Sequence, residues 1–114
     1  MVSADHPYSL TYERDGVVYV SGAVGIDENG RALAGDRQAL DAALGAVRAR
    51  LEAVGLGLEN IAKTTYFVTD VAMRDEANRQ FIEAFAEPRP ARTLVAVAAV
   101  PYGARVAIEA VAHR

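Results

Sequence analysis

The chain has 114 residues, no cysteine, and 12 Lys and Arg against 15 Asp and Glu, for a formal net charge of −3. This length predicts one domain over residues 1–114, and the composition excludes disulfides, thiolate metal ligands and a cysteine nucleophile. The positive residues are scattered, which disfavours nucleic-acid binding, and no stretch approaches the roughly 20 apolar residues of a membrane span, so we expect a cytoplasmic protein without membrane contact.

The N-terminal third predicts a β-hairpin followed by a loop. Residues 9–14 alternate in polarity, residues 15–16 are Asp-Gly, and residues 17–20 are Val-Val-Tyr-Val. This pattern is typical of two antiparallel strands joined by a two-residue turn. Residues 27–30 end in Asn-Gly and predict a loop. Residues 31–33 are an optional further strand.

Two segments have the apolar periodicity of amphipathic helices. The first follows Asp36, a good N-cap residue, and ends at Gly55, which is typical of position C′. Its apolar positions are Leu40, Ala43, Leu44, Val47, Leu51 and Val54. The second comes after a strand at residues 61–69, can be capped by Asp70 and is stopped by Pro88. Its apolar face consists of Met73, Ala77, Phe81, Ala84 and Phe85.

The last quarter holds two apolar runs separated by a Pro/Gly turn. Residues 94–100 have no polar side chain, and residues 106–112 have one. Both runs are rich in β-branched residues, which predicts strands buried on both faces. The complete order, β-β-(β)-α-β-α-β-β, predicts an α+β fold with two helices packed on one face of a mixed sheet. Since no element is left to cover the other face, another copy of the chain is its simplest cover.

Each of these last two strands is associated with one charged residue, which needs either an ion-pair partner or a function in binding or catalysis. Arg92 lies where a loop leads into the first strand, and its planar fork suits a small carboxylate, although pairing with a surface carboxylate is the usual fate of an arginine. Glu109 lies inside the second strand, where it is either an ion-pair partner of Arg105 or Arg92, or a catalytic group. If the turn is centred on residues 102–103, Arg92 and Glu109 point to the same sheet face.

The rest of the sequence offers little other chemistry. No metal motif is present, and the two histidines, His6 and His113, lie near opposite ends, where we expect them to be solvated. The glycines of residues 22–25 have neither a P-loop lysine nor the dinucleotide-binding spacing, so we expect no cofactor. Tyr8 and Asn78 are weak signals on their own, since each could be an ordinary exposed residue.

Several short motifs, taken together and in this order, nevertheless resemble the RidA/YjgF family of enamine/imine deaminases, also called L-PSP endoribonucleases. They include Pro-Tyr-Ser at residues 7–9, Val-Ser-Gly at 20–22, Pro-Ala-Arg-Thr at 90–93 and Ile-Glu-Ala-Val-Ala at 108–112. The resemblance runs nearly from end to end. The last two motifs, at this separation, are its most specific part.

The resemblance implies a chorismate-mutase-like fold and a homotrimer with clefts between subunits. It also implies a hydrolase of the 2-iminobutanoate/2-iminopropanoate deaminase type, which converts reactive 2-imino acids to 2-keto acids and ammonia without a cofactor. In the family's pattern Arg92 binds the substrate carboxylate, and Glu109 helps to position the attacking water. Ser21 and Gly22 lie on the loop that lines the carboxylate site in this pattern. The remaining cleft residues are Tyr8, Asn78 and Leu94, the last through its backbone carbonyl.

The chain departs from the family's pattern at a few positions. Leu10 and Ala23 stand where the family often has glutamine, which leaves the preferred imino acid open. Two other functions remain as alternatives. One is an endoribonuclease or translation inhibitor, which the lack of a basic stripe disfavours. The other is a non-catalytic ligand-binding or chaperone-like trimer, which the presence of both Arg92 and Glu109 disfavours.

Overall fold

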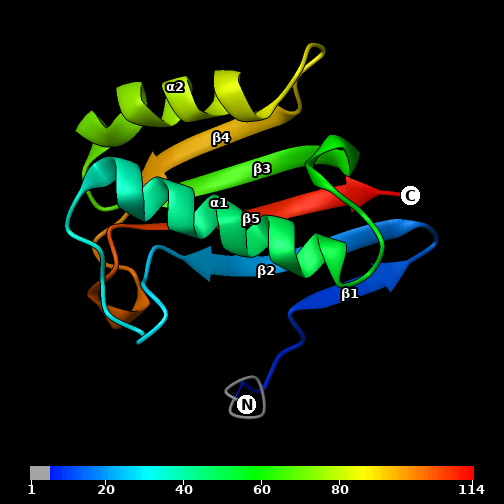
Figure 1. The fold of residues 1–114 in the computed structure, drawn as a ribbon, viewed down its shortest axis with the longest axis horizontal. Coiled ribbons are helices and arrows are strands. Elements are labelled where there is room, and N and C mark those ends of the chain that lie inside the picture. Colours follow the sequence, from blue (N-terminus) through cyan, green and yellow to red (C-terminus); the bar gives the residue numbers. More distant parts are fainter. Residues whose placement is uncertain (1–5) are drawn as a thin grey trace.

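One mixed sheet of five strands forms one layer of the protein, and two helices form the other (Figure 1). The computed structural model describes residues 6–114. The strands are β1 (Thr11–Arg14), β2 (Val17–Val24), β3 (Ile61–Val68), β4 (Ala91–Ala96) and β5 (Val106–His113). The helices are α1 (Asp36–Glu52) and α2 (Arg74–Ala84), with single 3-10 turns η2 (Leu58–Asn60), η3 (Val71–Met73) and η4 (Pro101–Gly103). The predicted α+β fold is confirmed.

The strand order in space is β1-β2-β5-β3-β4. Strands β3 and β4 run parallel, and the other neighbours pair antiparallel. The predicted hairpin is confirmed, since Asp15 and Gly16 have φ angles of 53° and 81° and form the turn between β1 and β2. The optional strand at residues 31–33 is absent, because Ala32 makes only an isolated bridge to Ile26.

The helix ends show where local rules held and where they did not. Gly55 has a φ of 82°, and the N–H of Leu56 donates to the carbonyl of Leu51, so the predicted glycine stop is confirmed. The predicted cap at Asp36 is wrong, because Gly35 is the N-cap. Asp36 is already the first helical residue, and its carboxylate instead accepts a hydrogen bond from the side chain of Arg105.

The second helix is reached through a short 3-10 turn. The carboxylate of Asp70 accepts a hydrogen bond from the N–H of Ala72 at 2.9 Å and so caps η3, which leads directly into α2. Along α2 the apolar residues predicted for its inner face are buried, with Ala84 only partly so. The predicted capping residue is therefore correct, although the first turn that it caps is 3-10 and not α-helical.

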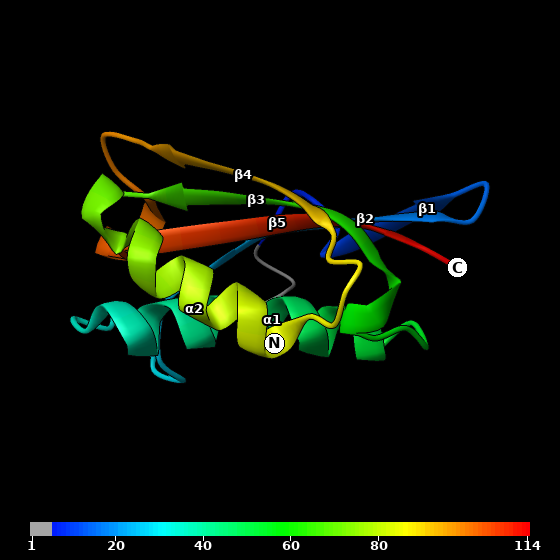
Figure 2. The ribbon, with the colours of Figure 1, turned by 90° about the horizontal axis from the view of Figure 1, so that it is seen from above.

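The two faces of the sheet differ completely in their surroundings. Both helices lie on one face, the covered face, and no element of residues 6–114 lies on the other, the open face (Figure 2). On β5 the alternation is regular, with Ile108 buried on the covered face and Glu109 exposed on the open face. The prediction that the last two strands are buried on both faces is wrong for a single chain, since Val95 on β4 is 40% exposed.

None of the helices within residues 6–114 is both long and apolar enough to cross a membrane.

Candidate functional site

Arg92 lies on β4, the edge strand of the sheet, and its side chain points toward the helices. Its Cζ atom is 5.3 Å from the ring centroid of Tyr66 and 5.1 Å from that of Phe81. Its Nη2 atom donates a hydrogen bond of 2.5 Å to Oδ1 of Asn78, on α2. Two aromatic rings and an amide therefore hold the guanidinium.

No carboxylate within residues 6–114 neutralises this guanidinium. Its Nη1 atom is buried and has no hydrogen-bond partner among those residues. Burial lowers the pKa of Arg92 from its usual value, because the charged form loses solvation. The group lines a small open pocket together with Asn78, Phe81 and Ile82. An unpaired, partly desolvated guanidinium at a pocket is suited to bind an anion.

Glu109 lies on the open face of β5 and is exposed. In the register of the sheet it aligns with Thr65 on β3. On its other side, β2 bulges between the pairs Val20–Ala110 and Ala23–Ile108, so residues 21–22 oppose Glu109. The family's pattern places Ser21 and Gly22 on the loop that lines the carboxylate site. Within one chain, the sheet register brings them next to Glu109 and not to Arg92.

The structure gives no support to an ion pair between Glu109 and either arginine. Arg105 instead forms an ion pair with the carboxylate of Asp36, whose Oδ1 atom lies 2.9 Å from Nε and 2.6 Å from Nη2 of the arginine. No ion pair in residues 6–114 includes Glu109. An exposed carboxylate without a cation beside it remains available as an acceptor for water.

The segment before β1 is tied to the β2 bulge. The N–H of Ser21 donates to the carbonyl of Leu10 at 3.0 Å, and its hydroxyl donates to the carbonyl of Ser9 at 2.7 Å. Tyr8, which is 50% exposed, lines one pocket with Gly22. The sequence motifs at residues 7–9 and 20–22 are therefore neighbours in the fold.

Arg50 also lines this pocket, and the sequence reasoning missed it. Its Nη1 atom donates to the carbonyl of Ser21 at 2.7 Å, and burial lowers the pKa of its guanidinium. Arg50 is three residues after Val47 on α1, beside the apolar stripe of the helix. That position was the available signal, because an arginine at the border of an apolar stripe extends along the protein surface.

The prediction that Arg92 and Glu109 share a sheet face is wrong. Arg92 pairs with Thr64 of β3, whereas Glu109 pairs with the next residue, Thr65, and successive strand residues point to opposite faces. The prediction counted alternation through a turn between two neighbouring strands. In the structure β3 lies between β4 and β5, and residues 97–105 form a longer connection that carries no register from one strand to the other.

The predicted site residues thus fall into two groups within one chain. The arginine half-site consists of Asn78, Arg92 and Leu94, with the Leu94 side chain packed against the core. The glutamate half-site consists of Tyr8, Ser21, Gly22 and Glu109. Within residues 6–114 each adjoins an unpaired edge, since β4 is the last strand of the sheet and β1 pairs with residues 17–20 of β2 but not with its last four residues.

Metal-ligating side chains are dispersed in the part of the chain that the structure describes, where no group of three or more His, Cys, Asp or Glu residues gathers. His6 stacks on Tyr8 with ring centroids 5.0 Å apart. With Arg50 beside the glutamate half-site, the two half-sites therefore offer two cations, one carboxylate and hydrogen-bonding groups. These can bind a small anion and orient a water molecule.

Comparison with known proteins agrees with the motifs. A family model described as endoribonuclease L-PSP matches residues 1–114. The human protein named 2-iminobutanoate/2-iminopropanoate deaminase is 35% identical over 108 residues, which cover 93% of this chain and 79% of the human one. The crystal structure of RidA from the Antarctic bacterium Psychrobacter sp. PAMC 21119 matches with a TM-score of 0.90 and 31% identity, covering 96% of this chain and 90% of that one. E. coli TdcF with bound serine matches with a TM-score of 0.83 and 32% identity, covering 96% and 89%.

Proposed function

Because this chain belongs to the RidA/YjgF family, also described as the endoribonuclease L-PSP family, we propose that it hydrolyses reactive 2-imino acids to 2-keto acids and ammonia. The observation that carries the proposal is the state of Arg92. Its guanidinium contacts two rings, lines an open pocket and has no carboxylate partner in residues 6–114. The substrate carboxylate is the anion that this group would bind.

The reaction requires little beyond the positioning of the substrate carboxylate and a water molecule. A 2-imino acid carries its carboxylate next to an electrophilic C=N carbon, which water attacks directly. Arg92 would hold the carboxylate, while Glu109 would accept a proton from the attacking water. Water adds its oxygen to the carbon, the C–N bond breaks, and the nitrogen leaves as ammonia with the protons from water. The carbonyl of Leu94 would help to orient that water, and Tyr8, Ser21 and Gly22 would line the cleft.

The two half-sites need each other for this chemistry, and one chain keeps them on opposite faces of the sheet. We propose that a homotrimer unites them, with the β4 edge of one protomer meeting the β2 bulge of its neighbour. Two features support the assembly: both half-sites adjoin unpaired edges, and the open face exposes large apolar side chains, among them Val95 and Tyr19. The serine in E. coli TdcF carries the same α-carboxylate as a 2-imino acid.

A coupled assay tests the reaction. An amino-acid oxidase generates imines in situ from a panel of amino acids, and the formation of 2-keto acid is followed with and without this protein. We expect acceleration for some members of the panel, and its loss in Arg92→Ala. The matched control is Arg105→Ala, which removes another partly exposed arginine, one that forms an ion pair with Asp36. No acceleration with any imine would refute the deaminase proposal.

The family's other description, endoribonuclease L-PSP, supplies the competing function. RNA cleavage by the purified protein, lost in Arg92→Ala and retained in Arg105→Ala, would favour it over the deaminase. Calorimetry with a 2-keto acid tests the alternative that the protein binds a ligand without catalysing a reaction. Binding of the keto acid without any acceleration of imine hydrolysis would indicate a ligand-binding protein that uses the same cleft.

A further inference from the structure

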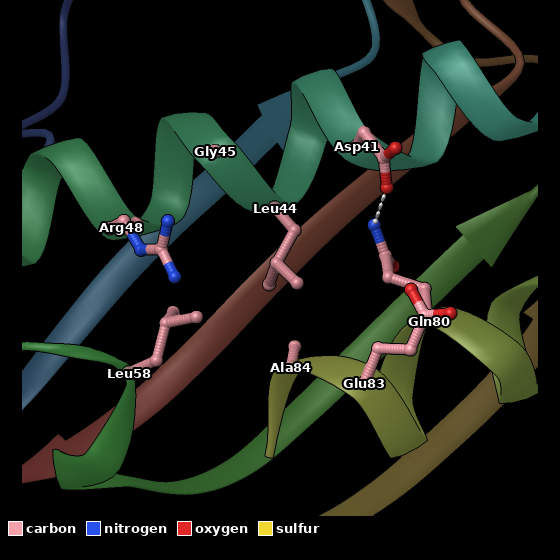
Figure 3. Close-up of a pocket in the computed structure, with 8 residues that line it drawn as sticks. All are labelled: Asp41, Leu44, Gly45, Arg48, Leu58, Gln80, Glu83 and Ala84. Carbon is pink, nitrogen blue, oxygen red and sulfur yellow. Dashed lines mark hydrogen bonds between the residues drawn. The ribbon is translucent and has the colours of Figure 1, made fainter.

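Behind Arg92, three polar side chains from three different elements form a hydrogen-bonded chain. The hydroxyl of Tyr66 on β3 donates to Oε1 of Gln80 on α2 at 2.9 Å. The Nε2 atom of Gln80 then donates to Oδ1 of Asp41 on α1, also at 2.9 Å (Figure 3). Tyr66 has no exposed surface, and Gln80 is 4% exposed. We call these three residues the Asp41–Gln80–Tyr66 chain.

Each donor and acceptor in this chain has a defined direction. Burial raises the pKa of Tyr66, so its hydroxyl keeps its proton and donates. That donation assigns Oε1 of Gln80 as the acceptor and leaves its Nε2 group to donate to the carboxylate of Asp41. Because the acceptor at the end of the chain is an acidic side chain, that last hydrogen bond is charge-assisted. The amide of Gln80 therefore has one orientation and fixes α2 relative to α1 and β3.

The same residues of α2 and β3 also hold Arg92. The Tyr66 ring packs on the guanidinium, and Phe81, the residue after Gln80, packs on it as well. Asn78, two residues before Gln80, accepts the hydrogen bond from Arg92. The two ring contacts and the hydrogen bond of the guanidinium thus come from β3 and α2, the two elements that the Tyr66–Gln80 hydrogen bond joins.

An apolar core would not need this arrangement. Buried hydroxyl and amide groups cost stability unless each is paired, and leucine or phenylalanine would fill the same space without that requirement. The chain also ends at a specific place. Asp41 and Gln80 line a groove between α1 and α2 that includes Arg48 and Glu83 (Figure 3). The line of hydrogen bonds therefore connects the outer surface of the helix layer with the aromatic ring on which Arg92 rests.

We propose that Asp41, Gln80 and Tyr66 are positioning residues that hold the Arg92 guanidinium in the orientation that binds the substrate carboxylate. This inference rests on the proposed function, because it assigns Arg92 that task. If the chain is broken, the Tyr66 ring and α2 can shift, and the guanidinium loses its alignment with the carboxylate. An anchor that holds substrate and transition state equally well affects KM and leaves kcat nearly unchanged.

Three variants break the chain at different points: Tyr66→Phe removes only the hydroxyl, Gln80→Leu removes both hydrogen bonds, and Asp41→Leu removes the terminal acceptor. Asp41→Asn keeps an acceptor oxygen and serves as the conservative rescue. Val47→Ala is the matched control, because Val47 is fully buried on α1 and takes no part in the chain. For each protein we would measure KM and kcat in the coupled assay, the Kd of a 2-keto acid by calorimetry, and the free energy of unfolding.

We expect Gln80→Leu and Asp41→Leu to raise both KM and the keto-acid Kd about tenfold, the effect of losing one charge-assisted hydrogen bond. Their kcat should stay within about twofold of the wild type. Tyr66→Phe and Asp41→Asn should show smaller rises of the same kind. Val47→Ala should lose stability and keep its KM and Kd.

Unchanged KM and Kd in Gln80→Leu and Tyr66→Phe, with stability lost as in Val47→Ala, would overturn the positioning role. If Gln80→Leu does not fold, Tyr66→Phe decides alone, since it deletes one hydroxyl and keeps the ring. Failure of the proposed function gives a different result. In that case no imine is hydrolysed by the wild type, while the Kd series still tests the inference. A wild type that binds no 2-keto acid overturns both.

Discussion

The charged residues on the covered and open faces of the sheet have opposite surroundings. On the covered face, Arg92 contacts two rings and an amide, and one of its nitrogens is buried without a partner in residues 6–114. On the open face, Glu109 is exposed and lies between Thr65 of β3 and the bulge of β2 at residues 21–22. The arginine is oriented by side chains of its own chain, whereas the glutamate has no ion-pair partner within residues 6–114 and would gain further contacts if another protomer covered the open face.

This difference separates two kinds of dependence. Changes on the covered face should act within a single protomer, on the orientation of Arg92 or on folding. Changes on the open face should act through assembly, because that face has no packing partner within residues 6–114. The predictions below test this separation, from the largest expected effect to the smallest.

Val97→Asp should have the largest effect, because it should prevent the protomers from assembling. Val97 follows β4 and lines a pocket on the open face with Phe67 and Ala107. An aspartate buried in a protein–protein interface should raise the dissociation constant roughly 1,000-fold or more and take the activity with it. Light scattering measures the loss. Val71→Asp is the control, since Val71 is 59% exposed on η3. A wild type that is monomeric at micromolar concentration would contradict both the trimer and the shared cleft.

Arg92→Ala should lower kcat/KM roughly 100- to 1,000-fold while the fold and the assembly persist, because a charge-assisted anchor is lost. Arg92→Lys should stay within about tenfold of the alanine variant, since a point charge does not reproduce the planar fork. Steady-state kinetics in the coupled assay, with circular dichroism as a fold check, measure both. Near wild-type turnover in Arg92→Ala would show that the carboxylate binds elsewhere.

Glu109→Gln should lower kcat about 100-fold, because an amide is a much poorer proton acceptor for the attacking water. The Kd of a 2-keto acid should change by less than about twofold, since Glu109 is proposed to act on water and not on the carboxylate. Kinetics and calorimetry on the same preparation separate the two effects. An unchanged kcat with a lower melting temperature would indicate a structural role instead.

Alkaline pH should destabilise the covered face through Tyr66. Its pKa is raised in the folded state, so its contribution to stability is complete below the usual tyrosine pKa of about 10 and is lost as the pH rises above it. Between pH 10 and pH 11 this one residue should cost about 1 kcal/mol. Urea unfolding across this range should show a steeper loss for the wild type than for Tyr66→Phe. Equal slopes would show that Tyr66 ionises as easily in the fold as in the unfolded chain.

The smallest effect is expected for Arg105→Ala. Its ion pair with Asp36 is more than a third exposed on the aspartate side, so its removal should cost about 0.5 to 1 kcal/mol of unfolding free energy. Activity should stay at the wild-type level, because Arg105 pairs with Asp36 and not with Glu109. A large loss of activity would revive a link between Arg105 and the reaction.

Local patterns in the sequence were sufficient for most of the secondary structure. Asp-Gly at residues 15–16 specifies a tight turn because both residues accept positive φ angles. The apolar spacing over α1 and α2 predicts their buried faces, since a helix must bury one stripe. Asp36 shows the limit of such rules. The sequence pattern does not distinguish Gly35 from Asp36 as the N-cap. The hydrogen bond between Asp36 and Arg105, which is 69 residues away, cannot be inferred from the local sequence.

By itself, the sequence determined most of the elements, the α+β class and the family, because periodicity, turn residues and short motifs are local properties. It placed the fourth strand too late, since the apolar run at residues 94–100 extends beyond β4, which ends at Ala96. Only the tertiary structure decided the order of the strands and therefore the face to which each charge points. Residues 97–105 connect β4 to β5 without pairing them, and β3 inserts between the two. Strand pairing depends on contacts between distant residues, and a shift of one residue reverses every side chain. The separation of Arg92 from Glu109, the hydrogen bond from Arg50 to the carbonyl of Ser21 and the Asp41–Gln80–Tyr66 chain all follow from that long-range arrangement.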